Sequence, residues 1–180
     1  LEGNSDSFRM KLSFLPNGNC VILPNINGRG YGFFKITEGE SSGLWSVLRS
    51  SEDEVLKGSL LITLYENLRW KTISPQGFRE EMLAYLPNES NSLLFSMALS
   101  YLGDCQRIFP SDSRPLEQVL WKIVTTNPVS QHRLQAFRLY RSIADSEEAV
   151  QRLYTLWQER KAPKDCTLSE SDYIGLSYML

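Results

Sequence analysis

The chain has 180 residues, of which 42% are hydrophobic and 22% are charged, and these proportions are typical of a soluble globular protein with one sizeable core. They exclude a disordered, collagen-like or coiled-coil chain. With 19 Lys and Arg against 21 Asp and Glu, the net charge is -2, so no overall basic field draws the chain to nucleic acid or anionic lipid. The apolar runs fall far below the ~20 residues that span a bilayer, and no signal peptide opens the chain. We therefore expect no nucleic-acid partner and no membrane association.

The first 37 residues follow the alternating pattern of β-strands. Strands are predicted from Phe8 to Phe14, from Cys20 to Leu23 and from Tyr31 to Ile36, with a Pro-Asn-Gly-Asn turn over residues 16–19 between the first two. Residues 1–37 are therefore predicted to form a small antiparallel β meander, which buries little surface by itself.

From residue 38 onward the pattern changes to helices. Helix starts are predicted near residues 52, 75, 89, 114 and 128 from capping residues, proline positions and apolar residues at helical spacing, and Ser51 is the predicted cap of the first. Two further helices are predicted to begin at the pairs Asp145 with Glu148 and Thr167 with Glu170. Alternate starts among the first five recur every 37 to 39 residues, as stacked helical hairpins do. Residues 38–180 are therefore predicted to form an α-α superhelix of HEAT- or ARM-like hairpins.

His132 is the only histidine, and Cys20, Cys105 and Cys166 lie far apart in the sequence. A zinc site with two or three imidazoles is impossible within this chain, and the cysteine spacing fits neither a disulfide framework nor a CxxC metal site. No nucleophile is visibly paired with His132, so we interpret it as a partly exposed residue without a catalytic role. The sequence therefore predicts no catalytic residue, no metal-binding residue and no cofactor in this chain.

Arg29 to Phe33 reads RGYGF and fits the start of an RNA-recognition signature, whose aromatic residues stack on bases. That signature needs a strand, a helix and another strand before it, whereas only 28 residues precede Arg29 and none is predicted to be helical. Because a strand rather than a helix follows the glycines, a phosphate-binding loop is not expected either. We interpret the segment as a Gly-rich turn that enters a buried aromatic strand.

Between Arg114 and Lys164 the chain has nine Lys and Arg against five Asp and Glu. Within this cationic excess, Arg133, Arg138 and Arg141 lie on one predicted helix and are candidate contacts for a peptide carboxylate. The alternative is a solvated helical face whose long side chains cover apolar neighbours.

Four stretches resemble the C-terminal region of aminopeptidase N-type zinc metallopeptidases. Asn25 to Phe34 is similar to the last strand of their β-sandwich domain, and Val55 to Leu68 to the first long helix of their helical domain. Glu89 to Leu102, with its Glu-x-Asn start, is similar to a later helix, and Leu168 to Tyr173 to a further helix start. The resemblance implies that the β meander is the remnant of a sandwich domain and that the helices belong to a superhelical domain.

In this family a separate domain supplies an HExxH helix and a downstream glutamate that bind zinc, and no such motif occurs in this sequence. The resemblance implies that the complete enzyme removes N-terminal residues from peptides, while this part closes and gates the active-site chamber. The chain alone is then expected to be inactive. Its partners would be the missing catalytic domain, which would hold the zinc, and the peptide substrates. The alternative is a stand-alone HEAT-like scaffold that binds a protein or peptide along its concave face.

Overall fold

The computed structural model describes residues 11–14, 20–25, 32–163 and 166–178. These residues are mostly helical, with eight α-helices, one short 3-10 helix and two short strands among them. The chain divides into two compact units, Leu1–Phe78 and Arg79–Leu180. This division does not test the boundary predicted after residue 37, which stays a prediction. Within the described ranges, no helix is both long enough and apolar enough to cross a bilayer.

The first unit begins with an antiparallel pair of strands, β1 (Lys11–Phe14) and β2 (Cys20–Leu23). Both strands fall within predicted ones, whereas residues 8–10 and the turn predicted over 16–19 lie outside the described residues. β2 packs on α1 (Glu38–Ser50) through Val21, which is buried. The approach is close, since a Cβ added to Gly43 would lie 2.7 Å from Val21 Cγ2. A glycine at this point of α1 therefore leaves room for the strand.

The third predicted strand is wrong for residues 32–36, which form no strand. The backbone of this segment binds a helix side chain instead of a neighbouring strand. Asn67, fully buried on α2 (Glu54–Arg69), accepts from the N–H of Ile36 at 2.9 Å and donates to the carbonyl of Phe34 at 2.8 Å. The expectation of a buried aromatic strand is also wrong at Phe33, which is 41% exposed and lies beside the ring of Trp70.

The helix starts of the first unit depend on side chains that bind the first turn. Thr37 and Glu40 form a capping box at the start of α1, a helix that is not among those predicted from the sequence. Asp53 caps α2 by accepting from the N–H groups of Val55 and Leu56, and the predicted cap, Ser51, ends α1 instead. Asp53 rather than Ser51 caps α2 because its carboxylate directly precedes the first turn and faces the positive end of the helix.

α3 (Pro75–Tyr85) begins where the sequence predicts, and the hydroxyl of Ser74 accepts from the N–H of Gly77 at 3.2 Å. The core of the first unit lies between α1 and α2, and the ring of Trp45 meets that of Phe78 edge-on at 5.5 Å. The apolar residues buried there include Leu44, Leu48, Leu60, Leu61, Leu64 and Leu68.

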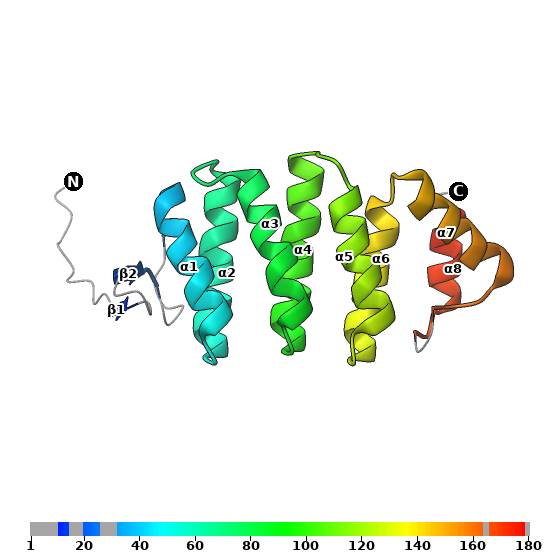
Figure 1. The fold of residues 1–180 in the computed structure, drawn as a ribbon, viewed down its shortest axis with the longest axis horizontal. Helices are drawn as coiled ribbons and strands as arrows, with labels where there is room; N and C mark the ends of the chain where they lie inside the picture. The colour runs from blue at the N-terminus through cyan, green and yellow to red at the C-terminus, as the bar shows by residue number, and fades with distance from the viewer. Residues whose placement is uncertain (1–10, 15–19, 26–31, 164–165, 179–180) are drawn as a thin grey trace. The chain divides into compact units, whose positions relative to one another are not determined.

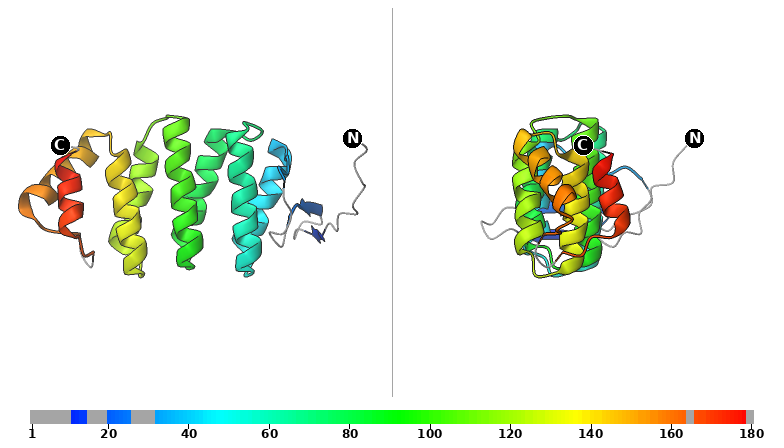
Figure 2. Two further views of the ribbon diagram at one scale, coloured as in Figure 1. Left: turned by 180° about the vertical axis from the view of Figure 1, so that it is seen from behind. Right: turned by 90° about the vertical axis from the view of Figure 1, so that its right-hand side faces the viewer.

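The second unit contains the rest of α3 and six further elements: η1 (Leu86–Asn88), α4 (Ser92–Ile108), α5 (Arg114–Thr126), α6 (Ser130–Ile143), α7 (Glu147–Glu159) and α8 (Glu170–Ser177). α6 packs against both α4 and α5, and α7 contacts α8 (Figures 1 and 2). The apolar face predicted for α5 is confirmed, because Leu116, Leu120, Ile123 and Val124 are all buried.

The predicted starts of α2 to α6 are correct to within three residues, but two further predicted caps are wrong. Ser146 rather than Asp145 caps α7, by accepting from the N–H of Ala149 at 3.2 Å. Ser169, with Asp172 as its capping-box partner, takes the place predicted for Thr167 at the start of α8. In both cases the hydroxyl that immediately precedes the first helical residue is the one that reaches the first turn.

Candidate functional site

His132 lies in the core of the second unit, so the expectation that it is partly exposed is wrong. Its ring is fully buried and stacks on Phe95 of α4, with the centroids 4.0 Å apart and the planes within 6°. Nε2 lies 3.1 Å from the hydroxyl oxygen of Ser92. Burial lowers the pKa of His132, an effect that the nearby carboxylate of Glu89 opposes. The residue therefore packs α6 against α4 as a neutral ring at pH 7.

The described residues contain no group of three or more His, Cys, Asp and Glu side chains that is arranged to hold a metal ion. Cys105 and Cys166 are buried, and burial raises the pKa of both thiols. The side chain of Cys20 lies outside the described part of the chain. Because the one imidazole is also inside the core, the residues described do not fit a zinc site, and we derive no step through a metal in this chain.

Two of the three predicted arginines converge on the start of α8. Arg138 donates to both carboxylate oxygens of Asp172, at 2.9 and 3.2 Å, and Arg141 donates to the backbone carbonyl of Asp172 at 2.9 Å. Asp172 is buried, and Arg138, followed by Ser169, holds the pKa of its carboxyl far below the ordinary value, although burial acts in the opposite direction. The two arginines thus attach α8 to α6.

Arg133, the third predicted arginine, does not contact Asp172 but binds the end of α5. Its Nε donates to the backbone carbonyl of Asn127, the residue that ends α5. The three arginines therefore do not form one cluster, and each makes a contact within the second unit. Their contact with a peptide carboxylate stays a prediction.

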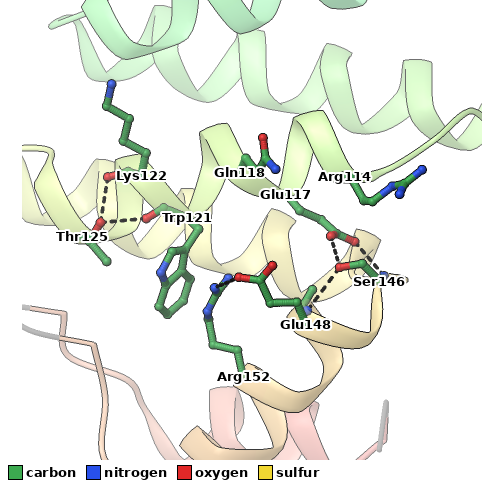
Figure 3. A pocket seen from close by; sticks show the side chains of 10 residues that line it. Arg114, Glu117, Gln118, Trp121, Lys122, Thr125, Ser146, Glu148 and Arg152 are labelled. Carbon is green, nitrogen blue, oxygen red and sulfur yellow. Dashed lines mark hydrogen bonds and ion pairs between the residues drawn. The ribbon is translucent and has the colours of Figure 1, made fainter.

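A groove of about 570 Å³ lies between α5 and the start of α7 (Figure 3). Side chains spaced three and four residues apart on α5 form one wall, as helical geometry requires. The residues that line the groove are Arg114, Glu117, Gln118, Trp121, Lys122 and Thr125 on one side and Ser146, Glu148, Ala149 and Arg152 on the other.

Trp121 and Arg152 face one another across this groove (Figure 3). The guanidinium carbon of Arg152 lies 4.5 Å from the centroid of the indole ring, and Nη1 donates to the hydroxyl of Tyr140 at 2.9 Å. Nη2 pairs with the carboxylate of Glu148 one helical turn away. The ring of Trp121 is also tilted against that of Tyr140, at 5.2 Å. These contacts fix a planar cation against an aromatic face.

Glu117 is buried at one end of the groove, and its carboxylate is turned toward the start of α7 (Figure 3). Oε1 accepts from the backbone N–H groups of Asp145 and Ser146, at 2.8 and 3.1 Å, and from the hydroxyl of Ser113 at 2.9 Å. Oε2 accepts from the hydroxyl of Ser146. Burial raises the pKa of Glu117, but these hydrogen bonds outweigh burial and hold the pKa below its ordinary value. The carboxylate is thus an internal anchor for α7.

The remaining charges of the groove are mainly positive. Lys122 is exposed, and among the described residues its ammonium pairs with no carboxylate. Arg114 is 70% exposed and binds Asp112, also at the surface. The arrangement is suited to binding anionic and apolar groups together. Trp121, Lys122 and Arg152 are not predicted as site residues from the sequence. The local excess of cations from Arg114 onward is the signal that includes Lys122 and Arg152.

No protein-family model matches this chain, and neither a curated protein nor a solved structure matches it.

Proposed function

We propose that this chain is a non-catalytic helical part of an aminopeptidase N-like zinc metallopeptidase. Its hairpins would stack into a superhelix that closes and gates the chamber in which the complete enzyme removes N-terminal residues from peptides. The catalytic domain would hold the zinc ion, which polarises the scissile carbonyl and activates water. The role of this chain would be to shape the chamber and to contact peptides.

The observation that carries the proposal is the structure of the Glu-x-Asn segment before α4. Glu89 is buried, accepts from the hydroxyl of Tyr85, and accepts from the N–H of Asn91 at 2.7 Å. Asn91 in turn caps α4 by accepting from the N–H groups of Leu93 and Leu94, at 2.9 and 3.0 Å. The Glu-x-Asn motif therefore forms the start of α4. This role supports the resemblance to the peptidase family with more than a hydrophobic pattern.

Two other parts of the resemblance agree with this proposal. The stretch from Val55 to Leu68 lies within the single continuous helix α2, as a first long helix should. The stretch from Leu168 to Tyr173 contains the capping box that starts α8.

The coding sequence upstream of Leu1 tests the proposal most directly. An upstream segment in the same frame that encodes HExxH and a downstream glutamate would support it, and a frame that starts at this domain would overturn it. A second test measures the hydrolysis of leucine p-nitroanilide by the purified chain, with and without added zinc. We expect no turnover in either case; zinc-dependent turnover would contradict a non-catalytic role.

The second candidate is a stand-alone HEAT-like scaffold for a protein or peptide. The groove between α5 and α7 favours it, because a concave surface with an aromatic wall and the exposed ammonium of Lys122 does not require a catalytic domain to bind a peptide. The upstream coding sequence separates the two candidates.

A further inference from the structure

The groove between α5 and α7 presents more positive than negative charge to solvent. Of its two carboxylates, that of Glu117 accepts four hydrogen bonds from the protein, so only that of Glu148 faces outward. Three cations line the same groove: Arg114, Lys122 and Arg152. Three of the nine cations between Arg114 and Lys164 therefore line this groove, whereas Arg133, Arg138 and Arg141 bind Asn127 and Asp172.

The contact between Glu148 and Arg152 indicates how the groove would hold an anion. Glu148 is 79% exposed, so the pair is a surface ion pair, and water and salt weaken such a pair strongly. Arg152 is more buried, and the Trp121 ring and the Tyr140 hydroxyl fix its guanidinium. A carboxylate from outside can therefore replace that of Glu148 without moving Arg152.

Lys122 supplies a second point of attachment. Its ammonium extends away from Arg152 (Figure 3), so the two cations are separated along the groove and would pair with carboxylates of different residues. The half-buried indole of Trp121, the residue before Lys122, lies against the guanidinium of Arg152 and adds apolar surface to the groove. This combination fits an extended segment in which acidic and apolar side chains alternate, and the groove volume of about 570 Å³ is in the range of ligand sites.

We propose that the groove between α5 and α7 binds an acidic peptide segment, whose carboxylates pair with Lys122 and Arg152 and whose apolar side chains pack on Trp121. This inference deepens the proposed contact with peptides and rests on it. It assigns that contact to Lys122 and Arg152 rather than to the arginines predicted from the sequence.

The test is fluorescence anisotropy of a short labelled peptide of alternating Glu and Leu, titrated with the whole chain. A Gln-Leu peptide and a Lys-Leu peptide of equal length are the matched probes. We expect the Glu-Leu peptide to bind at least fivefold more tightly than either of them. Equal affinity for the Glu-Leu and Gln-Leu peptides would overturn the inference. So would displacement of the bound peptide by a single-stranded oligonucleotide of the same charge at equal concentration, because the groove would then recognise negative charge alone.

Two substitutions have opposite expected effects. Lys122→Glu should weaken binding of the Glu-Leu peptide about fivefold, since it replaces an attraction by a repulsion. Glu148→Gln should tighten binding about threefold, because it removes the carboxylate that competes for Arg152. The matched controls are Lys161→Glu and Glu147→Gln, which make the same changes at exposed residues outside the groove lining and should leave the affinity unchanged. Equal effects of a variant and its control would overturn the assignment.

These outcomes are independent of the test of the enzyme family. A flat titration would refute the groove as a peptide site even if an HExxH segment is encoded upstream. A frame without HExxH would end the aminopeptidase proposal and leave the measured binding in place.

Discussion

Replacing Glu117 by alanine removes the acceptor that joins α5 to the start of α7. The carboxylate accepts from the backbone of Asp145 and from both the backbone and the hydroxyl of Ser146, and it is only 4% exposed. A buried hydrogen bond to a charged group contributes about 1.5 to 3 kcal/mol. The loss should be smaller than the sum for all donors, because Asp145 is exposed and water can reach the opened end of α7. We therefore expect Glu117→Ala to lower the free energy of unfolding by about 3 kcal/mol.

Glu117→Gln separates the contribution of the negative charge to stability from that of the hydrogen-bond geometry. A glutamine keeps a carbonyl oxygen where Oε1 accepts from three of the donors, and the hydroxyl of Ser146 can rotate to accept from the amide. The expected loss is about 1 kcal/mol, mainly from the charge near the positive end of α7. The control is Gln118→Ala, at the exposed neighbouring position, which should change stability by less than about 0.5 kcal/mol.

The assay is urea unfolding at pH 7, followed by circular dichroism, with hydrogen exchange of the α7 amides as a local probe. If the reasoning is right, exchange in α7 accelerates more than exchange in α4 in the alanine variant. The reasoning would be refuted if the alanine and glutamine variants lost the same stability, or if the alanine variant behaved like the Gln118 control.

Three further predictions concern other buried polar groups. Asn67→Ala should lower the free energy of unfolding by about 2 kcal/mol and expose residues 34–36 to hydrogen exchange, because it removes both of their backbone contacts; unchanged exchange there would contradict the assigned role. For His132, whose folded-state pKa is lowered, the unfolded chain takes up a proton near pH 6.5 and the folded chain does not, so stability should fall as the pH drops below that value. In urea unfolding, His132→Gln should reduce the change in the free energy of unfolding between pH 7 and 5. An unchanged pH dependence would refute the assigned role of His132. The folded-state pKa of Asp172 is lowered, so its carboxylate stabilises the fold above pH 3.8, the ordinary pKa of the group, and this contribution is lost as the pH falls toward the folded-state pKa. Asp172→Asn should therefore weaken the dependence of the free energy of unfolding on pH below pH 4. It should also accelerate hydrogen exchange in α8 at pH 7.

Helices and their buried faces can be predicted from this sequence because their signals are local. The start of α3 depends on adjacent residues, Ser74 and Pro75, and the buried face of α5 repeats within a single helix. The predicted cap of α7, Asp145, lies one residue too early, because Asp145 and Ser146 are both good caps and only the structure shows which one reaches the first turn. The capping box of Thr37 and Glu40 is a local signal of the same kind at the start of α1.

The other errors in the prediction involve contacts between residues far apart in the chain. Residues 32–36 have the composition of a strand, but their backbone groups bind Asn67, which lies 31 positions after Ile36. His132 is buried because α4 supplies the Phe95 ring, and nothing adjacent to His132 indicates this. The groove likewise requires Trp121 and Arg152 to meet from different helices. Amino-acid pattern alone does not determine such pairings.

The two hydrogen bonds between Asn67 and the backbone of residues 34–36 have a mechanical consequence for the first unit. Both hydrogen bonds lie just before the residue that caps α1, so tension applied from the N-terminal side reaches the side chain of Asn67 before it reaches that helix. A pulled chain would have to break two short bonds to a fully buried amide before α1 begins to unwind. Stretching in an optical trap should therefore leave α1 intact until both hydrogen bonds to Asn67 break.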